Sequence, residues 1–497
     1  MRFMELDPAT CYRAIRSRDP RFDGRFFTAV RSTGVYCRPI CPARTPLARN
    51  VRFFACAAAA EAAGFRPCRR CRPETSPGTP GWMGASATVA RALRLIEQGA
   101  LDHDDIEGLA RRLGLGSRHL RRLFIEHLGA PPVAVARTRR AHFARRLLDE
   151  TRLPIGEVAF AAGYESVRQF NHDMREIFRQ TPSALRRATP AAGAALREGA
   201  LALRLPLRPP YDWGAIRGFL AARSIAGVER VEGDVYRRTF RTRGGPGVLE
   251  VTPDPGGGAL RLRVTHGAAA DLLEIVRGTR RLFDLDADPA TIDARLAASP
   301  RLRRAVAARP GLRVPGAWDP FESAVRVILG QQVSVQAAST LCGRLVEAYG
   351  EPFAAARAHG LAFLFPSAER LAGSDLAALR MPGARKRAIR ALAAEVAARR
   401  VVLDGAGTLE DLLVRLRAVP GIGEWTAQVI AMRCCGEPDA FPAGDLGVRQ
   451  ALTRAGRAPT VPEALRIAET WRPWRAYACM HLWIINAAAR RPRSKEK

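Results

Sequence analysis

The stretch Leu416-Arg-Ala-Val-Pro-Gly-Ile-Gly-Glu-Trp-Thr-Ala-Gln428 decides the fold of the C-terminal half of the chain. Helical patterns precede and follow it, and Pro420, Gly421 and Gly423 predict a tight turn between the two helices. Glycine lets the backbone come close to a ligand, and the second helix starts directly after the turn. Its free N–H groups would therefore face outward, where an anion such as a DNA phosphate can bind.

A second glycine-containing break carries an acidic residue, Asp445, in the sequence Phe441-Pro-Ala-Gly-Asp445. One interpretation is an ordinary helical turn with an aspartate that caps a helix. The order of the glycine turn, Trp425, this loop and the later Pro473-Trp-Arg-Ala-Tyr-Ala478 resembles the helix-hairpin-helix DNA glycosylases. The resemblance implies that Asp445 is catalytic and that the two glycines of the hairpin bind DNA.

Composition points to a nucleic-acid partner. The chain has 497 residues, which is enough for about three domains, and a formal net charge of +31. Such an excess of basic residues favours a polyanion, with DNA or RNA as the first candidate. A GC-rich genome would explain the preference for arginine over lysine, but it would not explain the shortage of acidic residues.

The sequence contains no apolar run that approaches the ~18 residues of a membrane helix. Residues 1–8 have no apolar segment typical of a secretory signal. We therefore expect a cytoplasmic protein that does not bind membranes, and the family resemblances imply a bacterial, nucleoid-associated one. Disulfides are rare in that compartment, so the ten cysteines need another explanation.

Four cysteines are spaced for a metal ion, in Cys37-Arg-Pro-Ile-Cys41 and Cys68-Arg-Arg-Cys71. Two close pairs separated by a longer loop predict one tetrahedral zinc held by four thiolates. A small domain with few long apolar runs has a small hydrophobic core and needs a bound metal of this kind to be stable. The spacing alone favours a zinc site that only stabilises the fold.

The residues around the cysteines suggest more. Asp19-Pro-Arg-Phe-Asp-Gly-Arg-Phe26, Arg31-Ser-Thr-Gly-Val-Tyr-Cys-Arg-Pro39 and Ala63-Gly-Phe-Arg-Pro-Cys-Arg-Arg-Cys71 resemble the N-terminal domain of the Ada adaptive-response proteins over residues 5–74. The resemblance implies that Cys37 is both a zinc ligand and the acceptor of a methyl group from a DNA methyl phosphotriester. A zinc-bound thiolate is deprotonated yet nucleophilic, and the acceptor is consumed. Methylation would reduce the negative charge of the site, so we expect it to strengthen promoter binding.

Residues 86–187 have a helical pattern with two helix-turn-helix units. Ile106 to Phe124 and Ile155 to Arg175 each fit a helix, a glycine turn and a second helix, with Ser117 and Ser166 as the expected caps. A plain helical hairpin with a basic face is the alternative for either unit. The tandem resembles the AraC/XylS-type DNA-binding domain, which implies two recognition helices in successive major grooves. The polar residues on those helices are Arg118, His119, Arg121 and Arg122 in the first, and Arg168, Gln169, Asn171 and His172 in the second.

The remainder resembles AlkA-type 3-methyladenine DNA glycosylases over residues 203–490, beginning with Leu205-Pro-Leu-Arg-Pro-Pro-Tyr-Asp-Trp213. Residues 229–266 alternate apolar and polar positions, which predicts strands, and residues 285–490 return to helical periodicity. We thus expect a multidomain protein, mainly α with α+β parts. The predicted domains are a zinc-stapled α+β domain (1–75), an all-α double helix-turn-helix domain (86–187), an α+β subdomain (203–315) and an all-α helix-hairpin-helix domain (316–490), with linkers at 75–84 and 191–200.

The glycosylase resemblance assigns a substrate pocket to Phe219, Trp425 and Trp483, although each could be an ordinary core residue. Aromatic faces attract a positively charged N-alkylated purine. Val429 and Leu446 stand where relatives have aromatic residues, so a less aromatic pocket is expected. Gln332 matches the family position that wedges into the emptied base stack.

The expected chemistry is hydrolysis of a glycosidic bond on a flipped nucleotide. Asp445 would stabilise the oxocarbenium-like sugar and orient water. Trp425 stands where bifunctional relatives carry a Schiff-base lysine, so base excision without strand cleavage is predicted. The family implies a monovalent cation on the carbonyls of Arg417, Val419 and Ile422.

The predicted function is therefore alkylation repair combined with transcriptional activation. No Pro-Cys-His-Arg motif is present, so repair of methylguanine by methyl transfer is not expected. Two alternatives are a regulator whose glycosylase half only binds DNA, and a repair enzyme whose front half only anchors it. The expected partners are double-stranded DNA, alkylated or promoter, and RNA polymerase; the expected state is a monomer.

Overall fold

The computed structural model describes residues 7–77, 87–102, 104–187 and 200–490. They form two compact units: the described residues within 1–209, 240–280 and 285–287 form the first, and those within 210–239, 281–284 and 288–497 form the second. Residues 78–84 and 191–199 of the predicted linkers lie outside the described residues. No helix among the described residues is long and apolar enough to cross a membrane.

The first unit begins with a four-stranded sheet in the order β3-β1-β2-β4. Strand β1 pairs antiparallel with β2 and β3, whereas β2 pairs parallel with the short β4. Phe27, Ala29 and Tyr36 on the sheet pack against Ala57 and Ala60. The elements are α1 (Pro8–Ser17), η1 (Pro20–Phe22), β1 (Phe27–Val30), β2 (Val35–Cys37), η2 (Ala48–Asn50), β3 (Val51–Phe54), α2 (Ala57–Ala62), β4 (Arg66–Pro67) and η3 (Pro73–Thr75).

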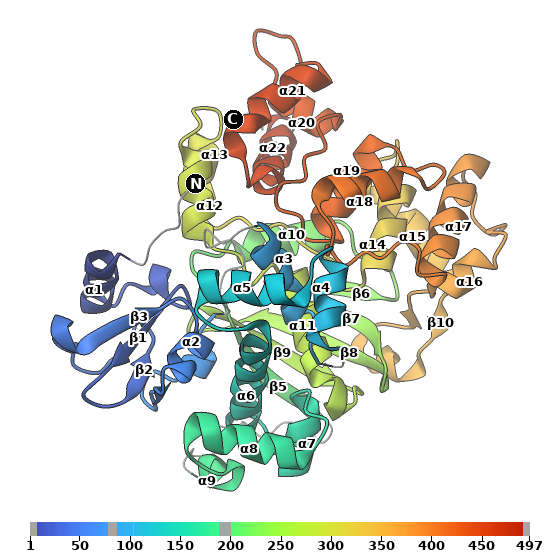
Figure 1. The fold of residues 1–497 in the computed structure, drawn as a ribbon. Coiled ribbons are helices and arrows are strands. Elements are labelled where there is room, and N and C mark those ends of the chain that lie inside the picture. The colour runs from blue at the N-terminus through green and yellow to red at the C-terminus, as the bar shows by residue number, and fades with distance from the viewer. Residues whose placement is uncertain (1–6, 78–86, 103, 188–199, 491–497) are drawn as a thin grey trace, which may run out of the picture. The chain divides into compact units, whose positions relative to one another are not determined.

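Seven helices follow among the described residues from Ala87 to Arg187, where the periodicity predicts helices. The central helix, α6, packs against α2, α7, α8 and α9 (Figure 1). Gly114 and Gly163 adopt positive φ at the two turns, a conformation that glycine takes without steric cost. The helices are α3 (Ala87–Glu97), α4 (Ile106–Arg112), α5 (Ser117–Leu128), α6 (Pro132–Glu150), α7 (Ile155–Ala161), α8 (Val167–Phe178) and α9 (Pro182–Arg187).

The two expected serine caps have different outcomes. Ser166 caps α8, because its hydroxyl accepts a hydrogen bond from the Gln169 N–H at 3.1 Å. Ser117 is not a cap: α5 begins at Ser117 itself, and Gly116 holds the cap position with extended backbone and no side-chain hydrogen bond. The prediction for Ser117 was wrong by one residue, which is the usual uncertainty of a helix boundary.

Strands β5 (Ala200–Pro206), β9 (Ala259–Thr265) and β8 (Gly245–Pro253) of the first unit form an antiparallel ladder. Strand β5 starts at Ala200, which the sequence assigned to the linker. Its inward side chains, such as Leu203 and Leu205, are buried, so the apolar alternation of the strand begins earlier than the composition suggested. The short η4 (Ala269–Asp271) and α11 (Leu272–Leu282) follow.

The second unit is mainly helical, with β6 (Glu229–Glu232) pairing antiparallel with β7 (Val235–Thr242). Helix α14 packs against α15, α17 and α19, and α18 packs against α19 (Figure 1). The remaining elements are α10 (Trp213–Ala221), α12 (Pro289–Ala297), α13 (Arg303–Ala308), α14 (Pro320–Leu329), α15 (Val335–Tyr349), β10 (Glu351–Pro352), η5 (Ala354–His359), β11 (Phe363–Leu364), α16 (Ala368–Ala372), α17 (Gly383–Ala397), α18 (Leu409–Arg417), α19 (Glu424–Arg433), α20 (Leu446–Ala451), α21 (Val461–Ala468), η6 (Glu469–Trp471) and α22 (Arg475–Arg490).

A buried polar cluster joins β6 and β7 to α14. Glu229 accepts hydrogen bonds from Tyr236 at 2.7 Å and from Arg326 at 2.9 Å, and Glu322 accepts one from Arg238 at 2.6 Å. Buried carboxylates are tolerated only when they are paired in this way. The cluster therefore fixes α14, whose C-terminal end leads to the predicted wedge.

Candidate functional site

Four cysteine thiols converge beside the small sheet. The sulfur atoms of Cys37, Cys41, Cys68 and Cys71 all lie within 4.8 Å of one another, and all four cysteines are free. Cys37 ends β2 and Cys68 follows β4, so the parallel pairing of these strands brings the two cysteine pairs together. Four sulfurs this close suit a tetrahedral zinc ion, which would also offset the repulsion between thiolates.

Hydrogen bonds connect the cysteine-bearing segments to helix α6. The Tyr36 hydroxyl, next to Cys37, donates to Glu61 Oε1 at 2.7 Å, and Glu61 Oε2 accepts from the Thr138 hydroxyl of α6 at 2.6 Å. Tyr36 also lies 3.0 Å from His142 Nε2 of α6. Arg72, next to Cys71, forms an ion pair with Asp149 of the same helix. No local sequence pattern predicts these contacts, because each joins residues far apart in the chain.

The predicted recognition helices present their polar residues to solvent. Arg118, His119, Arg121 and Arg122 of α5 are exposed, as are Arg168, Gln169 and His172 of α8, whereas Asn171 is half-buried. The opposite faces are apolar and buried, with Leu120 and Phe124 in α5 and Phe170 and Met174 in α8. Both helices thus have a free basic face suited to a DNA groove.

Asp445 accepts three hydrogen bonds at the start of α20. Oδ2 accepts from Trp425 Nε1 at 2.9 Å, and Oδ1 accepts from Trp483 Nε1 at 3.0 Å and from the Val448 N–H at 2.9 Å. The capping interpretation is therefore geometrically correct, since Val448 N is the third helical N–H. A cap needs only one of these donors, however, and the two indoles fix the carboxylate in a single orientation.

A cavity of about 390 Å³ lies against this carboxylate. Phe219, Trp425, Trp483 and Asp445 all line it, so the structure brings the predicted pocket residues together. The further lining residues include Arg223, Arg326, Val333, Ser334, Cys342, Val429, Arg433, Leu446 and Asn486. Val429 and Leu446, the two aliphatic residues expected in place of aromatic ones, both line the cavity, and Leu446 is 61% exposed.

Three arginines that line the cavity, Arg223, Arg326 and Arg433, were not predicted, and two of them contact Phe219. The guanidinium carbons of Arg223 and Arg433 lie 3.7 Å and 4.8 Å from the centre of the Phe219 ring. Burial, and then the charges of Arg433 and Arg326, lower the pKa of Arg223 to about 9. The ring of Phe219 is thus already in contact with cations of the protein. The spacing of Phe219 and Arg223, four residues apart at a helix end, was the available signal.

The hairpin joins α18 to α19 outside the cavity. Gly421 has φ +86°, and a Cβ atom there would lie 2.5 Å from the Cβ of Ala388 on α17, so only glycine fits. Gly423 caps α19 without a side-chain hydrogen bond, which leaves the first N–H groups of the helix to an anion. Gln332 is exposed with φ +55° in the loop between α14 and α15. These three residues lie close in the sequence to the lining residues Trp425 and Val333 but do not line the cavity themselves.

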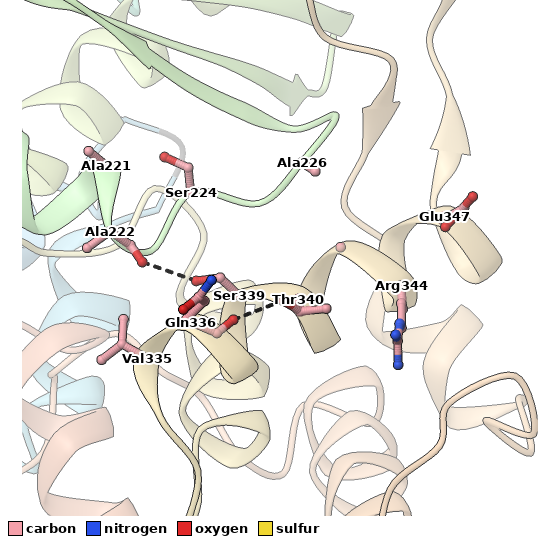
Figure 2. A pocket seen from close by; sticks show the side chains of 11 residues that line it. Ala221, Ala222, Ser224, Ala226, Val335, Gln336, Ser339, Thr340, Arg344 and Glu347 are labelled. Carbon is pink, nitrogen blue, oxygen red and sulfur yellow. Dashed lines mark hydrogen bonds between the residues drawn. The ribbon is translucent and has the colours of Figure 1, made fainter.

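A second, wide hollow of about 720 Å³ opens between the end of α10 and the outer face of α15 (Figure 2). Figure 2 shows the Ser339 hydroxyl donating to the Ala222 carbonyl, at 3.3 Å. Most of the other residues that line the hollow are small, and Arg344 and Glu347 lie at one end of it. The hollow shares Val335 and Ser339 with the cavity but contains none of the residues predicted to act on DNA.

Comparisons with known proteins find four family matches along the chain. Family models match residues 10–74 as the metal binding domain of Ada, 109–188 as a helix-turn-helix domain, 202–319 as the AlkA N-terminal domain and 325–476 as the HhH-GPD superfamily base excision DNA repair protein. The chain is 48% identical over 97% of both chains to "Probable bifunctional transcriptional activator/DNA repair enzyme AlkA" of Mycobacterium tuberculosis (strain H37Rv). The chain belongs to this family of bifunctional Ada/AlkA proteins.

Two further similarities each cover part of this Ada/AlkA family member. The DNA-3-methyladenine glycosylase 2 of Escherichia coli (strain K12) is 37% identical over 56% of this chain and 95% of its own. A solved 3-methyladenine DNA glycosylase from Archaeoglobus fulgidus, at 20% identity and a TM-score of 0.51, covers 58% of this chain and all of that chain. The second similarity supports the fold alone. The predicted multidomain fold class is confirmed, with the zinc-binding, helix-turn-helix and glycosylase parts all present.

Proposed function

We propose that the protein repairs alkylated DNA by excising bases of the 3-methyladenine type, and that it also accepts methyl groups from DNA phosphotriesters and activates transcription. The observation that carries the excision is the carboxylate of Asp445, held by two indole N–H groups against a cavity large enough for a nucleobase. The regulator with an inactive glycosylase half would not need this arrangement.

In the excision step the target nucleotide leaves the duplex and its base enters the cavity. As the glycosidic bond stretches, the sugar gains positive charge next to Asp445, and the fixed carboxylate stabilises it without reorganising. Water then adds to the sugar and the base leaves. Among the described residues that line the cavity there is no lysine, which supports excision without strand cleavage.

In the methyl transfer step the Cys37 sulfur attacks the methyl carbon of a phosphotriester. An S–C bond forms, the C–O bond breaks, and the phosphodiester leaves as an anion. A zinc ion on Cys37, Cys41, Cys68 and Cys71 would keep the thiolate deprotonated at neutral pH. The sulfur is left as a thioether, so each protein molecule reacts once.

The finer proposals rest on the same elements. Helices α5 and α8 read promoter DNA, and the side chains that contact its bases or phosphates are Arg118, Arg121, Arg168 and Gln169. The protein acts as a monomer on the nucleoid in the cytoplasm. Bound to a promoter, it contacts RNA polymerase. Gly421 and Gly423 bind the phosphates flanking the lesion while Gln332 fills the gap. A monovalent cation binds the carbonyls of Arg417, Val419 and Ile422.

The test is to incubate the protein with methylated DNA and to identify released bases by chromatography, comparing wild type with Asp445→Asn. Mass spectrometry of the same reaction should find one added methyl group on the peptide that contains Cys37. The expected result is that wild type releases methylated bases from the DNA and Asp445→Asn does not. Equal release by both proteins would contradict the proposed mechanism.

A further inference from the structure

Gln331, next to the predicted wedge, connects the wedge loop to the hairpin. Its side-chain Nε2 donates to the Gly421 carbonyl of the hairpin at 3.1 Å and to the Thr426 hydroxyl of α19 at 2.9 Å. Thr426 is 2% exposed, so this anchor is fixed in the protein core. One carboxamide thus joins two elements that are about ninety residues apart in the sequence.

The backbone of Gln331 is held as firmly as its side chain. The guanidinium of Arg385, in the first turn of α17, donates to the Gln331 carbonyl, and Arg385 is 8% exposed. The Gln331 N–H donates to Ile328 O at 3.2 Å, which continues the end of α14. Helix α17 also presses on the hairpin through Ala388, which leaves no room for a side chain at Gly421. Wedge loop, hairpin and α17 therefore meet at this residue.

Gln332, the tip itself, is in a strained conformation. Its φ of +55° is in the left-handed region, which a residue with a Cβ adopts only when its surroundings impose it. The anchored Gln331 precedes the tip, and Ser334, which caps α15 through the Ala337 N–H at 3.2 Å, follows it. The tip is thus held between two fixed points, although its own side chain is exposed.

We infer that Gln331 and Arg385 are positioning residues that hold the wedge tip at a fixed distance from the phosphate-binding hairpin. Binding of the hairpin to the DNA backbone would then insert the wedge into the base stack. The inference rests on the proposed excision activity. In duplex DNA the separation between a phosphate and the base stack is nearly constant, so a wedge that moved freely relative to the hairpin would enter the stack poorly. Neither residue lines the cavity, so neither is catalytic.

The test replaces Gln331 with methionine, which has similar length but donates no hydrogen bond. The substrates are two oligonucleotide duplexes with one 7-methylguanine, either paired with cytosine or placed in an unpaired bulge. An unpaired base needs little work to leave the stack. Because a misplaced group costs up to ~100-fold in rate, we expect single-turnover excision by Gln331→Met to fall by ~10- to 100-fold on the paired substrate. On the bulge the rate should stay within ~3-fold of wild type.

Gln336→Met is the matched control, since Gln336 is an exposed glutamine on the first turn of α15. It should match wild type on both substrates. Binding of undamaged duplex should be the same for all three proteins, because the hairpin glycines are unchanged. Arg385→Met should reproduce the paired-substrate defect, and thermal melting of each variant shows whether it is folded.

Two results would overturn the inference: an unchanged rate of Gln331→Met on the paired substrate, or equal losses on paired and bulged substrates. A fluorescent 2-aminopurine beside the lesion reports opening of the stack without any excision. If wild type opens the stack but releases no base, the proposed excision fails while the positioning role is still tested by Gln331→Met. If wild type opens nothing, both fail.

Discussion

Replacing Asp445 with asparagine removes a charge while keeping most of the geometry. The amide oxygen can take the place of Oδ1 and keep the bonds from Trp483 and Val448. The amide nitrogen then faces Trp425 Nε1 at the position of Oδ2, so two donors meet and one hydrogen bond is lost. An unmade hydrogen bond of this kind costs about 1–3 kcal/mol of stability. The second unit should therefore melt a few degrees lower but remain folded.

The effect on catalysis should be larger. A carboxylate about 4 Å from a sugar cation contributes about 4 kcal/mol at an effective dielectric constant of about 20. That free energy corresponds to about a 10³-fold decrease in rate. The assay is single-turnover release of 7-methylguanine from duplex DNA at saturating protein, with melting and binding of undamaged DNA measured in parallel.

Trp425→Phe provides the matched control for Asp445→Asn, because it removes the same N–H···O bond but leaves the carboxylate charged. We expect its excision rate to fall about tenfold, which corresponds to the loss of one net hydrogen bond of about 1.4 kcal/mol. If Asp445→Asn excises within tenfold of wild type, or is no slower than Trp425→Phe, the charge is not the catalytic feature. The reasoning from the oxocarbenium ion would then be refuted.

Three other perturbations test the remaining parts. Cys68→Ala should abolish zinc in metal analysis and unfold the N-terminal sheet by circular dichroism, since metal binding provides much of the folding energy of small zinc domains; retained zinc would contradict the four-thiolate site. Glu61→Ala removes the hydrogen bonds that join Tyr36 to Thr138 of α6 and leaves the Tyr36–His142 and Arg72–Asp149 contacts in place. It should reduce the gain in promoter affinity on methylation of Cys37, measured by titration at several salt concentrations, and an unchanged gain would show that the connection through Glu61 carries no signal. Burial, and then the charge of Arg309, lower the pKa of His481 to about 4, so the folded state binds fewer protons than the unfolded state between about pH 6.5 and 4. Stability should fall as the pH drops through that window, and His481→Gln should flatten the melting profile; parallel profiles would refute the assignment.

The features predicted correctly from the sequence are those that depend on a few neighbouring residues. The two cysteine pairs, the glycine turn and the aspartate after its own glycine each lie within a few residues, and the fold brought them to the expected places. Helix and strand periodicity likewise predicted the succession of elements. The cap at Ser117 and the start of β5 at Ala200 failed because the ends of elements depend on single residues whose propensities are weak.

What the sequence did not predict depends on contacts between distant segments. Trp425 and Trp483 were expected to be aromatic walls, yet their N–H groups are what orient Asp445. Gln331 and Gln332 are adjacent in the sequence. Only the folded chain shows that Gln331 binds the hairpin and that Gln332 is exposed. Side-chain hydrogen bonds over such separations have no periodic signature, so a single sequence cannot reveal them.

The charges in the cavity change the expected basis of selectivity. Arg326 is paired with Glu229 and Glu322, but neither Arg223 nor Arg433 forms a salt bridge within the described part of the chain. These two guanidinium groups line the same cavity as the carboxylate of Asp445, and both contact Phe219, the ring assigned to a cationic purine. Such a cavity offers little electrostatic gain for binding a positively charged base. Alkylation of a ring nitrogen instead makes the base a better leaving group, and that advantage appears only as the glycosidic bond breaks. We therefore expect the preference for alkylated bases to reside in the bond-breaking step next to Asp445 rather than in the affinity of the cavity.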